Sequence, residues 1–389
     1  MHILVIEANL EPSGGAPRGI LEVCRALAAR GHEVSLIHAR EGSLLPQYDR
    51  FLSWRKLVSW PPGAPGPVRW AVRSLRVASA ARPVDADVIY VHDPQGLQYS
   101  WMAAGVARAP LVVHLRIPAS FSRRWVLGLP FVASAIAVSE ATSDSYVRRG
   151  FASDRIEVIH NGVDLDVYRL KGNRADARRD LGIHPHAEVI LYAGRIIKEK
   201  GIDVLVESFK RFAADRQDAV LLIGSPPQSI KGSDEAYVAL LKRALEKEKV
   251  VWVRDCVDVI PLYEAADCVV VPSVWDEAFG RVVVEAMACE RPVLASDVGG
   301  IPEILGSEWP SFLFAKGDVD GLHEKLIRQT GWRRSDPGLG HSLRKYVRDH
   351  FSLERQILQV ERHLERAAAR GFKIDPKAAR TFRRVDPLA

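Results

Sequence analysis

The feature that most constrains the fold is a repeated alternation of short apolar runs with helical segments. Ile3–Glu7 has the composition of a strand and Ala16–Ala29 that of a helix. Gly31 follows where a C-terminal glycine stop belongs, and Val34–Ala39 is the next strand. Most of the runs are continuously apolar, which is typical of strands buried on both faces of a parallel sheet. The pattern predicts an α/β fold with helical crossovers.

The same alternation continues through the rest of the chain. Further strands are expected at Asp87–Val91, Leu111–His114, Ala135–Ser139, Arg155–Ile159, Val189–Tyr192, Ala219–Gly224, Val250–Val253, Cys268–Val271 and Pro292–Ala295. Helices are expected at Asp203–Ala214, Asp234–Lys247 and Val282–Cys289.

A charged, polar stretch from Tyr168 to His186 separates two such series. A chain of 389 residues has room for two to three domains. We therefore expect one doubly wound, Rossmann-like domain over 1–168 and a second over 169–352, with a C-terminal helix at about 353–389 packing back toward the first. Ligands of such sheets bind at the carboxyl ends of the strands, so we expect the active site in a cleft between the domains.

Composition excludes several classes of protein. With 47% hydrophobic and 26% charged residues the chain is not a disordered one. The net charge of +6 permits an anionic partner without identifying it. Four widely spaced cysteines suggest neither a zinc site nor a disulfide framework. The N-terminus does not resemble a signal peptide, and the apolar stretch 125–139 is shorter than the roughly 20 residues of a bilayer span, so we expect a cytoplasmic protein.

Two cations stand on a loop that follows an expected strand. Arg195 and Lys200 are five positions apart, and Gly194 and Gly201 flank them. A forked guanidinium and an ammonium group can converge there on one diphosphate. A solvated basic turn is the alternative.

Two carboxylates follow a later strand. Glu277 lies in a loop, and Glu285 lies eight residues on, inside an apolar helix that Gly280 opens after Phe279. A buried carboxylate needs a hydrogen-bonding partner, which a hydroxylated ligand or a structural arginine can supply. Backbone N–H groups at the helix start can approach a phosphate.

The first strand and helix are joined by a glycine pair, Gly14 and Gly15, which resembles a phosphate or sugar cradle but is weak by itself. His92 and His114 end expected buried strands and should point into the cleft. A core or capping histidine is the alternative for each.

Together these residues resemble the retaining nucleotide-sugar transferases of glycosyltransferase family 4, also called glycosyl transferases group 1, which have the GT-B fold of two Rossmann-like domains. The resemblance covers nearly the whole chain. It rests on five segments in order: the N-terminal glycine pair followed by RALAARGHEV, HNGVD at 160–164, AGRIIKEKGID, EAFGRVVVEAMA and VGGIPEIL. Ala278 departs from the commoner proline or glycine.

The resemblance implies a role for each matching residue. Arg195 and Lys200 would bind the donor diphosphate, Glu277 the hydroxyls of the transferred sugar and Glu285 the ribose hydroxyls. Residues that would approach the donor through their backbone are Gly14, Gly15, Gly194, Phe279 and Gly280. His114 would contact the sugar near the reacting carbon. The catalytic set is then His114, Arg195, Lys200 and Glu277.

No metal or other cofactor is expected. Two DxD strings, Asp164-Leu165-Asp166 and Asp85-Ala86-Asp87, have the form of the metal motif of the other large transferase fold. Asp164 instead ends the HNGVD segment, and Arg195 and Lys200 would supply the electrostatic stabilisation.

A basic stretch in the first domain bears on the acceptor. From Arg50 to Val84 there are seven cations, three tryptophans and no acid. We assign an acceptor or membrane surface to Arg69, Arg73, Arg76, Arg123 and Arg124. Basic residues with tryptophan fit an anionic membrane at the inner face, a lipid-linked or glycan acceptor, or an anionic soluble one. A solvated helix with core tryptophans is the alternative.

The predicted function is thus a metal-independent, retaining transfer from a nucleotide-sugar, most simply a UDP- or GDP-sugar, to a glycan, lipid-linked or small-molecule acceptor. A UDP-sugar epimerase of the same fold and a soluble natural-product glycosyltransferase are the alternatives within the fold. A basic nucleic-acid or membrane-binding module is the non-enzymatic alternative, but it would not explain the paired glutamates, and we expect no nucleic-acid partner.

Overall fold

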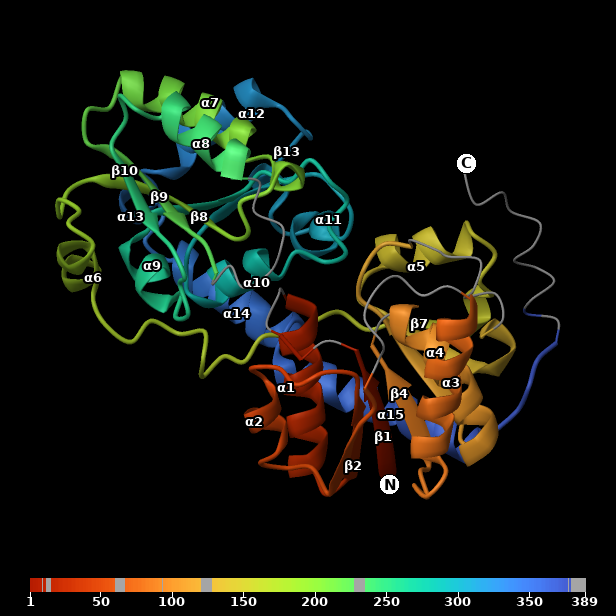
Figure 1. Ribbon diagram of the computed structural model, residues 1–389. Coiled ribbons are helices and arrows are strands. Elements are labelled where there is room, and N and C mark those ends of the chain that lie inside the picture. Colours follow the sequence, from red (N-terminus) through yellow and green to blue (C-terminus); the bar gives the residue numbers. More distant parts are fainter. Residues whose placement is uncertain are drawn as a thin grey trace. The chain divides into compact units, whose positions relative to one another are not determined.

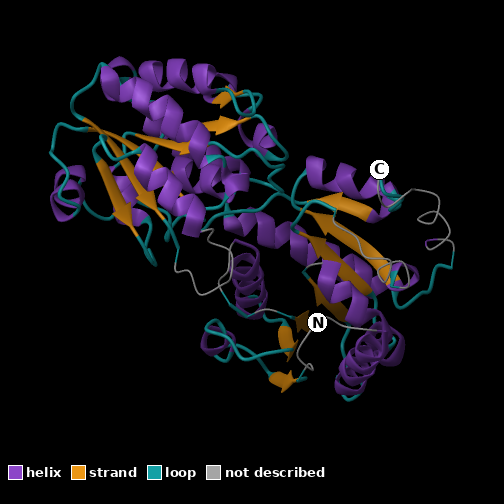
Figure 2. Ribbon diagram, turned by 45° about the horizontal axis from the view of Figure 1, so that its top comes forward, coloured by secondary structure: helices purple, strands orange, loops and turns teal. Residues whose placement is uncertain are grey.

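The computed structural model divides the chain into two compact units. Unit 1 comprises Met1–Asn161 and Gln356–Ala389, and unit 2 comprises Gly162–Arg355. The structure describes residues 1–8, 10–11, 15–59, 67–92, 94–119, 128–226, 235–376 and 378. In each unit the strands lie between helices, as Figure 2 shows, and the predicted fold of two doubly wound α/β domains is confirmed.

Unit 1 contains a seven-stranded sheet of order β3-β2-β1-β4-β5-β6-β7 (Figure 1). Its strands are β1 (His2–Glu7), β2 (Glu33–His38), β3 (Trp54–Leu57), β4 (Val88–Val91), β5 (Leu111–Leu115), β6 (Val132–Ala137) and β7 (Ile156–Val158). Its helices are α1 (Gly15–Ala29), α2 (Leu45–Tyr48), α3 (Pro67–Ala81), α4 (Pro94–Ala107), α5 (Glu140–Val147) and most of α15 (Leu353–Arg370).

Unit 2 contains a six-stranded sheet of order β10-β9-β8-β11-β12-β13. Its strands are β8 (Glu188–Ala193), β9 (Ala219–Gly224), β10 (Val250–Val253), β11 (Cys268–Val271), β12 (Val293–Ser296) and β13 (Leu313–Phe314). Its helices are α6 (Arg174–Asp180), α7 (Ile202–Ala214), α8 (Glu235–Ala244), α9 (Ile260–Ala265), α10 (Arg281–Ala288), α11 (Ile301–Leu305), α12 (Val319–Gln329), α13 (Trp332–Ser335) and α14 (Leu339–His350).

The central strands are buried, as their continuously apolar sequences predicted. β4, β5, β9, β11 and β12 are buried along their whole length, and the strands pair in parallel. Two strands were not predicted, β3 and β13, and both lie at a sheet edge. β3 is mostly exposed and β13 has two residues, so neither has the apolar run that marks a central strand.

Helix α15 is blue in Figure 1. Its side chains make polar contacts with unit 1. Glu361 accepts hydrogen bonds from Arg30 and pairs with His32 at 2.7 Å. His363 lies 2.6 Å from a Glu157 oxygen and 2.8 Å from the Ser134 hydroxyl. Most of α15 is therefore part of the first unit.

Candidate active site

Three loops of unit 2 meet because of the strand order. β8, β11 and β12 are neighbours and parallel, so their carboxyl ends lie at one edge of the sheet. The strand order reverses between β8 and β11, which is where doubly wound sheets bind their ligands. The loops that follow these strands, 194–201, 272–280 and 297–300, carry the motifs singled out in the sequence.

Two glycines allow these loops to touch. Gly201 has a φ of +61°, and a Cβ there would lie 2.0 Å from the carbonyl oxygen of Pro272. Gly299 has a φ of +55°, and a Cβ there would lie 2.1 Å from the carbonyl oxygen of Glu277. The next residue, Gly300, donates its N–H to the same oxygen at 2.8 Å. Backbone packing thus fixes the position of the Glu277 loop.

The Glu277 carboxylate is the centre of a polar cluster. Its Oε1 accepts hydrogen bonds from Lys200 Nζ and Ser273 Oγ, each at 2.5 Å. Within the described part of the chain Oε2 has no hydrogen-bond partner. The structure therefore joins Lys200 to Glu277, although these residues were predicted to bind different parts of a donor. Ser273 was missed, although it directly follows the apolar run of β11 and Pro272.

Arg195 lies on the same loop as Lys200. The residue is exposed, and its side chain has no ion pair or hydrogen bond to any residue that the structure describes. Its carbonyl oxygen accepts a hydrogen bond from the Tyr192 hydroxyl at 2.6 Å. Burial, and next the Glu277 carboxylate, raise the pKa of Tyr192 well above its usual value, so this hydroxyl remains a donor. At the end of the same strand Gly194 donates to the Gly224 carbonyl at 2.9 Å.

Helix α10 begins at the predicted glycine. Gly280 caps it with a φ of +103°, and the preceding Phe279 is buried, its ring 5.9 Å from that of Phe351. Glu285 Oε1 accepts a hydrogen bond from Arg281 Nε at 3.2 Å. The sequence left two partners open for this carboxylate, a hydroxylated ligand and a structural arginine. For Oε1 the structure shows the arginine.

In unit 1, His114 is fully buried at the end of β5. Its Nδ1 lies 2.5 Å from the Tyr90 hydroxyl, and among the described residues its Nε2 has no hydrogen-bond partner. Burial lowers the pKa of His114 well below its usual value. Gly15 begins α1, whereas Gly14 lies outside the described residues.

Two charged residues of unit 1 were missed. Glu7, the last residue of β1, is buried, and its carboxylate contacts the Nδ1 atom of the buried His92, which follows β4. Arg116 follows β5, is 6% exposed and donates to Asn161 Oδ1 at 3.1 Å. A polar residue at the end of a buried strand is the signal that could have found both.

The basic stretch requires a correction. Arg69 and Arg76 are exposed on α3, but Arg73 is 6% exposed and its guanidinium contacts Tyr99 of the neighbouring α4, so it is not part of an exposed surface. Val68 and Leu75 on the same helix are 76% and 56% exposed. The predicted Arg123 and Arg124 lie outside the described residues.

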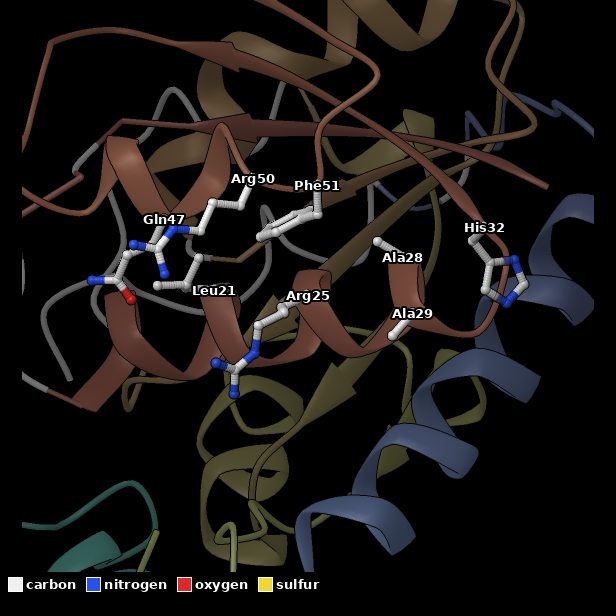
Figure 3. Close-up of a pocket in the computed structure, with 8 residues that line it drawn as sticks. All are labelled: Leu21, Arg25, Ala28, Ala29, His32, Gln47, Arg50 and Phe51. Atoms are coloured by element: carbon white, nitrogen blue, oxygen red, sulfur yellow. The ribbon is translucent and has the colours of Figure 1, made fainter. Parts of the chain in front are cut away.

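Unit 1 also has a pocket of about 420 Å³ along α1 and α2, shown in Figure 3. It contains none of the predicted donor or acceptor residues. The side chains that line it include two arginines, a histidine and no acid: Leu21, Arg25, Ala28, Ala29, His32, Gln47, Arg50 and Phe51.

Among the described residues, one group has the spacing of a metal site: His32, Glu361 and Glu365. Glu361 already accepts hydrogen bonds from Arg30, and none of the three belongs to the predicted donor site. No helix in the described segments has the length and hydrophobicity needed to cross a membrane.

This fold and this loop cluster define a class of protein, the two-domain GT-B transferases. A family model described as "Glycosyltransferase Family 4" matches residues 13–167, and one described as "Glycosyl transferases group 1" matches residues 173–330. The chain belongs to this family of glycosyltransferases, as the sequence motifs predicted.

Curated relatives match parts of the chain. A D-inositol 3-phosphate glycosyltransferase of Mycobacterium sp. (strain KMS) is 42% identical over 151 residues, which are 38% of this chain and 33% of the relative. An alpha-maltose-1-phosphate synthase of Mycobacterium tuberculosis (strain ATCC 25618 / H37Rv) is 31% identical over 59% of this chain and 62% of its own length. The match thus spans between a third and two thirds of these relatives.

Solved structures share the fold over most of the chain. Alr3699/HepE of Anabaena, in complex with UDP and glucose, has a TM-score of 0.80 at 21% identity and covers 93% of this chain and 99% of its own. Sucrose-phosphate synthase of Thermosynechococcus elongatus has a TM-score of 0.76 at 22% identity and covers 95% of this chain and 99% of its own.

Proposed function

We propose that the chain transfers a sugar from a nucleotide-sugar, most simply a UDP- or GDP-sugar, to an acceptor hydroxyl with retention of the anomeric configuration. The observation that carries the proposal is the cluster of Lys200, Glu277 and Ser273 at the point of unit 2 where the strand order reverses. Arg195 lies on the same loop as Lys200, and its side chain has no partner among the described residues. Family membership and the UDP-bound structure of Alr3699/HepE support it.

Charge explains how this cluster would act. Breaking the anomeric C–O bond leaves positive charge on the sugar and adds negative charge to the departing diphosphate. Arg195, Lys200 and the N–H groups at the start of α10 would stabilise that negative charge without a metal. Glu277 would hold the sugar hydroxyls through Oε2, and Glu285 would use its second oxygen for the ribose.

Retention follows if the acceptor attacks from the side that the diphosphate leaves. The acceptor oxygen bonds to the anomeric carbon as the C–O bond to phosphate breaks, and the acceptor proton passes to the departing phosphate oxygen. No enzyme nucleophile is needed, and the family resemblance assigns His114 to a contact with the sugar.

The acceptor belongs to unit 1 in this proposal. Names of the relatives, such as D-inositol 3-phosphate glycosyltransferase, favour an acceptor that carries an anionic group. The exposure of Val68 and Leu75 next to Arg69 and Arg76 favours, as a second candidate, a lipid-linked acceptor reached at an anionic membrane surface.

The test is a thermal-shift panel of UDP, GDP, ADP, CDP and dTDP, each with and without EDTA. A ligand at 100 times its Kd adds about 2.7 kcal/mol of stability. A shift with one nucleotide that EDTA leaves unchanged, and that is lost in Glu285→Gln, identifies the donor class. A shift abolished by EDTA would contradict metal independence, and no shift with any of them would contradict the transferase itself.

A further assay separates transfer from epimerisation. Incubating the donor that gave the shift without an acceptor should leave its sugar unchanged. Conversion to an epimer would favour the epimerase. Salt-dependent binding of DNA without nucleotide binding would favour a nucleic-acid module.

A further inference from the structure

Arg116 is a buried cation of unit 1 whose guanidinium contacts Asn161, His114 and Tyr90. It stands one residue after β5 and is 6% exposed. Its Nη1 donates to Asn161 Oδ1 at 3.1 Å, and its Nη2 lies 3.4 Å from His114 Nδ1. Among the described residues no carboxylate forms an ion pair with it. Burying a guanidinium without a paired carboxylate lowers the stability of the fold. This cost indicates that Arg116 is buried for a functional reason.

The contact with His114 determines which ring nitrogen carries the proton. The Tyr90 hydroxyl, 2.5 Å from Nδ1, could donate to that nitrogen or accept from it. A guanidinium can only donate. Nδ1 must therefore be the acceptor, and in the neutral ring the proton lies on Nε2. In the part of the chain that the structure describes, this buried Nε2 has no hydrogen-bond partner.

We propose that Arg116 is a positioning residue for sugar transfer, which holds His114 as the neutral Nε2–H tautomer and fixes the ring relative to Asn161. The inference rests on the proposed function, in which His114 contacts the transferred sugar. An Nε2–H group can then donate to a sugar oxygen, whereas the other tautomer would present a lone pair.

A neutral ring suits the charge that develops in this reaction. The sugar becomes positive as its bond to the diphosphate breaks, and an imidazolium beside it would raise the barrier. Burial, then Arg116, then His92 and His363 lower the pKa of His114. Arg116 thus orients the His114 ring and also disfavours its protonation to an imidazolium.

Asn161 links this arrangement to another part of the unit. Its Oδ1 also accepts a hydrogen bond from Gln356 Nε2 at 3.3 Å, and Gln356 lies in α15. Asn161 belongs to the HNGVD segment and is the last residue of unit 1 before unit 2 begins. Arg116 therefore positions His114 relative to Asn161, whose Oδ1 accepts hydrogen bonds from both Arg116 and Gln356.

The direct test is the tautomer itself. In the wild-type protein, selectively ¹⁵N-labelled at histidine, two-bond ¹⁵N–¹H correlations should assign His114 as the neutral Nε2–H form from pH 5 to pH 8. Tyr90→Phe should keep this tautomer, because the arginine still donates to Nδ1. An Nδ1–H form in the wild type, or a switch of tautomer in Tyr90→Phe alone, would overturn the inference.

Kinetics supply a readout that a purely structural role would not produce. Arg116→Gln should lower kcat at least about tenfold with little change in the KM for the donor. The loss should grow as pH falls, because removing the cation lets His114 protonate. Arg116→Lys should recover part of kcat. Arg25→Gln, an exposed arginine of the same unit without a partner in the described structure, is the matched control.

The outcomes separate this inference from the proposed function. A wild-type protein that binds no nucleotide and transfers no sugar contradicts the proposed function. An active wild type whose Arg116→Gln variant keeps its kcat and its pH profile contradicts only the role of Arg116. If Arg116→Gln does not fold, the wild-type tautomer and the Arg116→Lys kinetics decide.

Discussion

The first six strands of unit 1 follow the same order as the six strands of unit 2, yet the two units differ at the point where that order reverses. In unit 2 the loops after β8, β11 and β12 touch through glycine backbones, and the Lys200–Glu277 pair is partly accessible to solvent. In unit 1 the corresponding edge holds the buried pair of Glu7 and His92, next to the buried His114. Charges on loops stay in contact with water, whereas a carboxylate at a buried strand end needs a polar partner inside the protein.

The largest effect that separates the two designs is expected for Glu7→Gln. Replacing this buried carboxylate leaves the His92 ring without its polar partner, so the free energy of unfolding of unit 1 should fall by about 3 kcal/mol. Chemical denaturation measures it. Glu207→Gln, in the exposed pair with Lys210 on α7, is the control and should change stability by about 0.5 kcal/mol or less. Equal losses in the free energy of unfolding of both variants would show that the Glu7–His92 contact does not stabilise unit 1.

Arg195→Ala should have the opposite signature, with catalysis impaired and stability retained. Loss of one preorganised donor to a developing charge lowers kcat about 10²-fold, which is about 2.7 kcal/mol in the barrier. The free energy of unfolding should stay the same, because the side chain has no partner in the described structure. Lys198→Ala, an exposed cation on the same loop, is the control in steady-state assays. Rates within threefold of wild type for Arg195→Ala would refute its assignment.

Gly299→Ala tests whether glycine packing positions the Glu277 loop. The new Cβ would lie 2.1 Å from the Glu277 carbonyl oxygen, so the loop must shift and nucleotide binding should weaken. Gly317→Ala shares a positive φ, +74°, but its Cβ would meet nothing within 4 Å. We expect Gly299→Ala to be less stable than Gly317→Ala by about 2 kcal/mol. Thermal denaturation with and without nucleotide compares them, and equal behaviour would refute the packing argument.

Acid should weaken unit 1 through its buried histidines. Burial lowers the pKa of both His114 and His363 in the folded state, so unfolding takes up protons below the usual histidine pKa of about 6.5. Their contribution is complete above pH 6.5 and is lost as pH falls, by up to about 1.4 kcal/mol per pH unit for a histidine kept neutral. Amide hydrogen exchange in unit 1 between pH 7.5 and pH 5, corrected for intrinsic rates, measures it. Constant stability over that range would contradict the direction.

Much of the fold follows from local pattern. Continuous apolar runs predicted the central strands, because a strand covered on both faces excludes polar residues whatever its neighbours are. The edge strands β3 and β13 were missed because an edge strand has one neighbour and can be short or exposed. Likewise Arg73 looks equivalent to Arg69 along the helix, and only the packing of α4 buries it.

In the candidate site, too, some residues can be recognised from the local sequence, whereas their contacts depend on the tertiary structure. Arg195, Lys200, Glu277 and Gly280 stand in contiguous segments whose residue order shows their chemistry. The sequence by itself thus determined the family, the doubly wound domains and the loops that carry these side chains.

Only the tertiary structure decided which of these side chains meet. The contact of Lys200 with Glu277 joins residues 77 positions apart, and that of Arg116 with Asn161 joins residues 45 positions apart. The physical reason is that a hydrogen bond depends on a separation in space, which strand order and loop packing set. The local sequence indicates the polarity and the preferred conformation of each residue. It does not indicate which distant residue will be its hydrogen-bond partner.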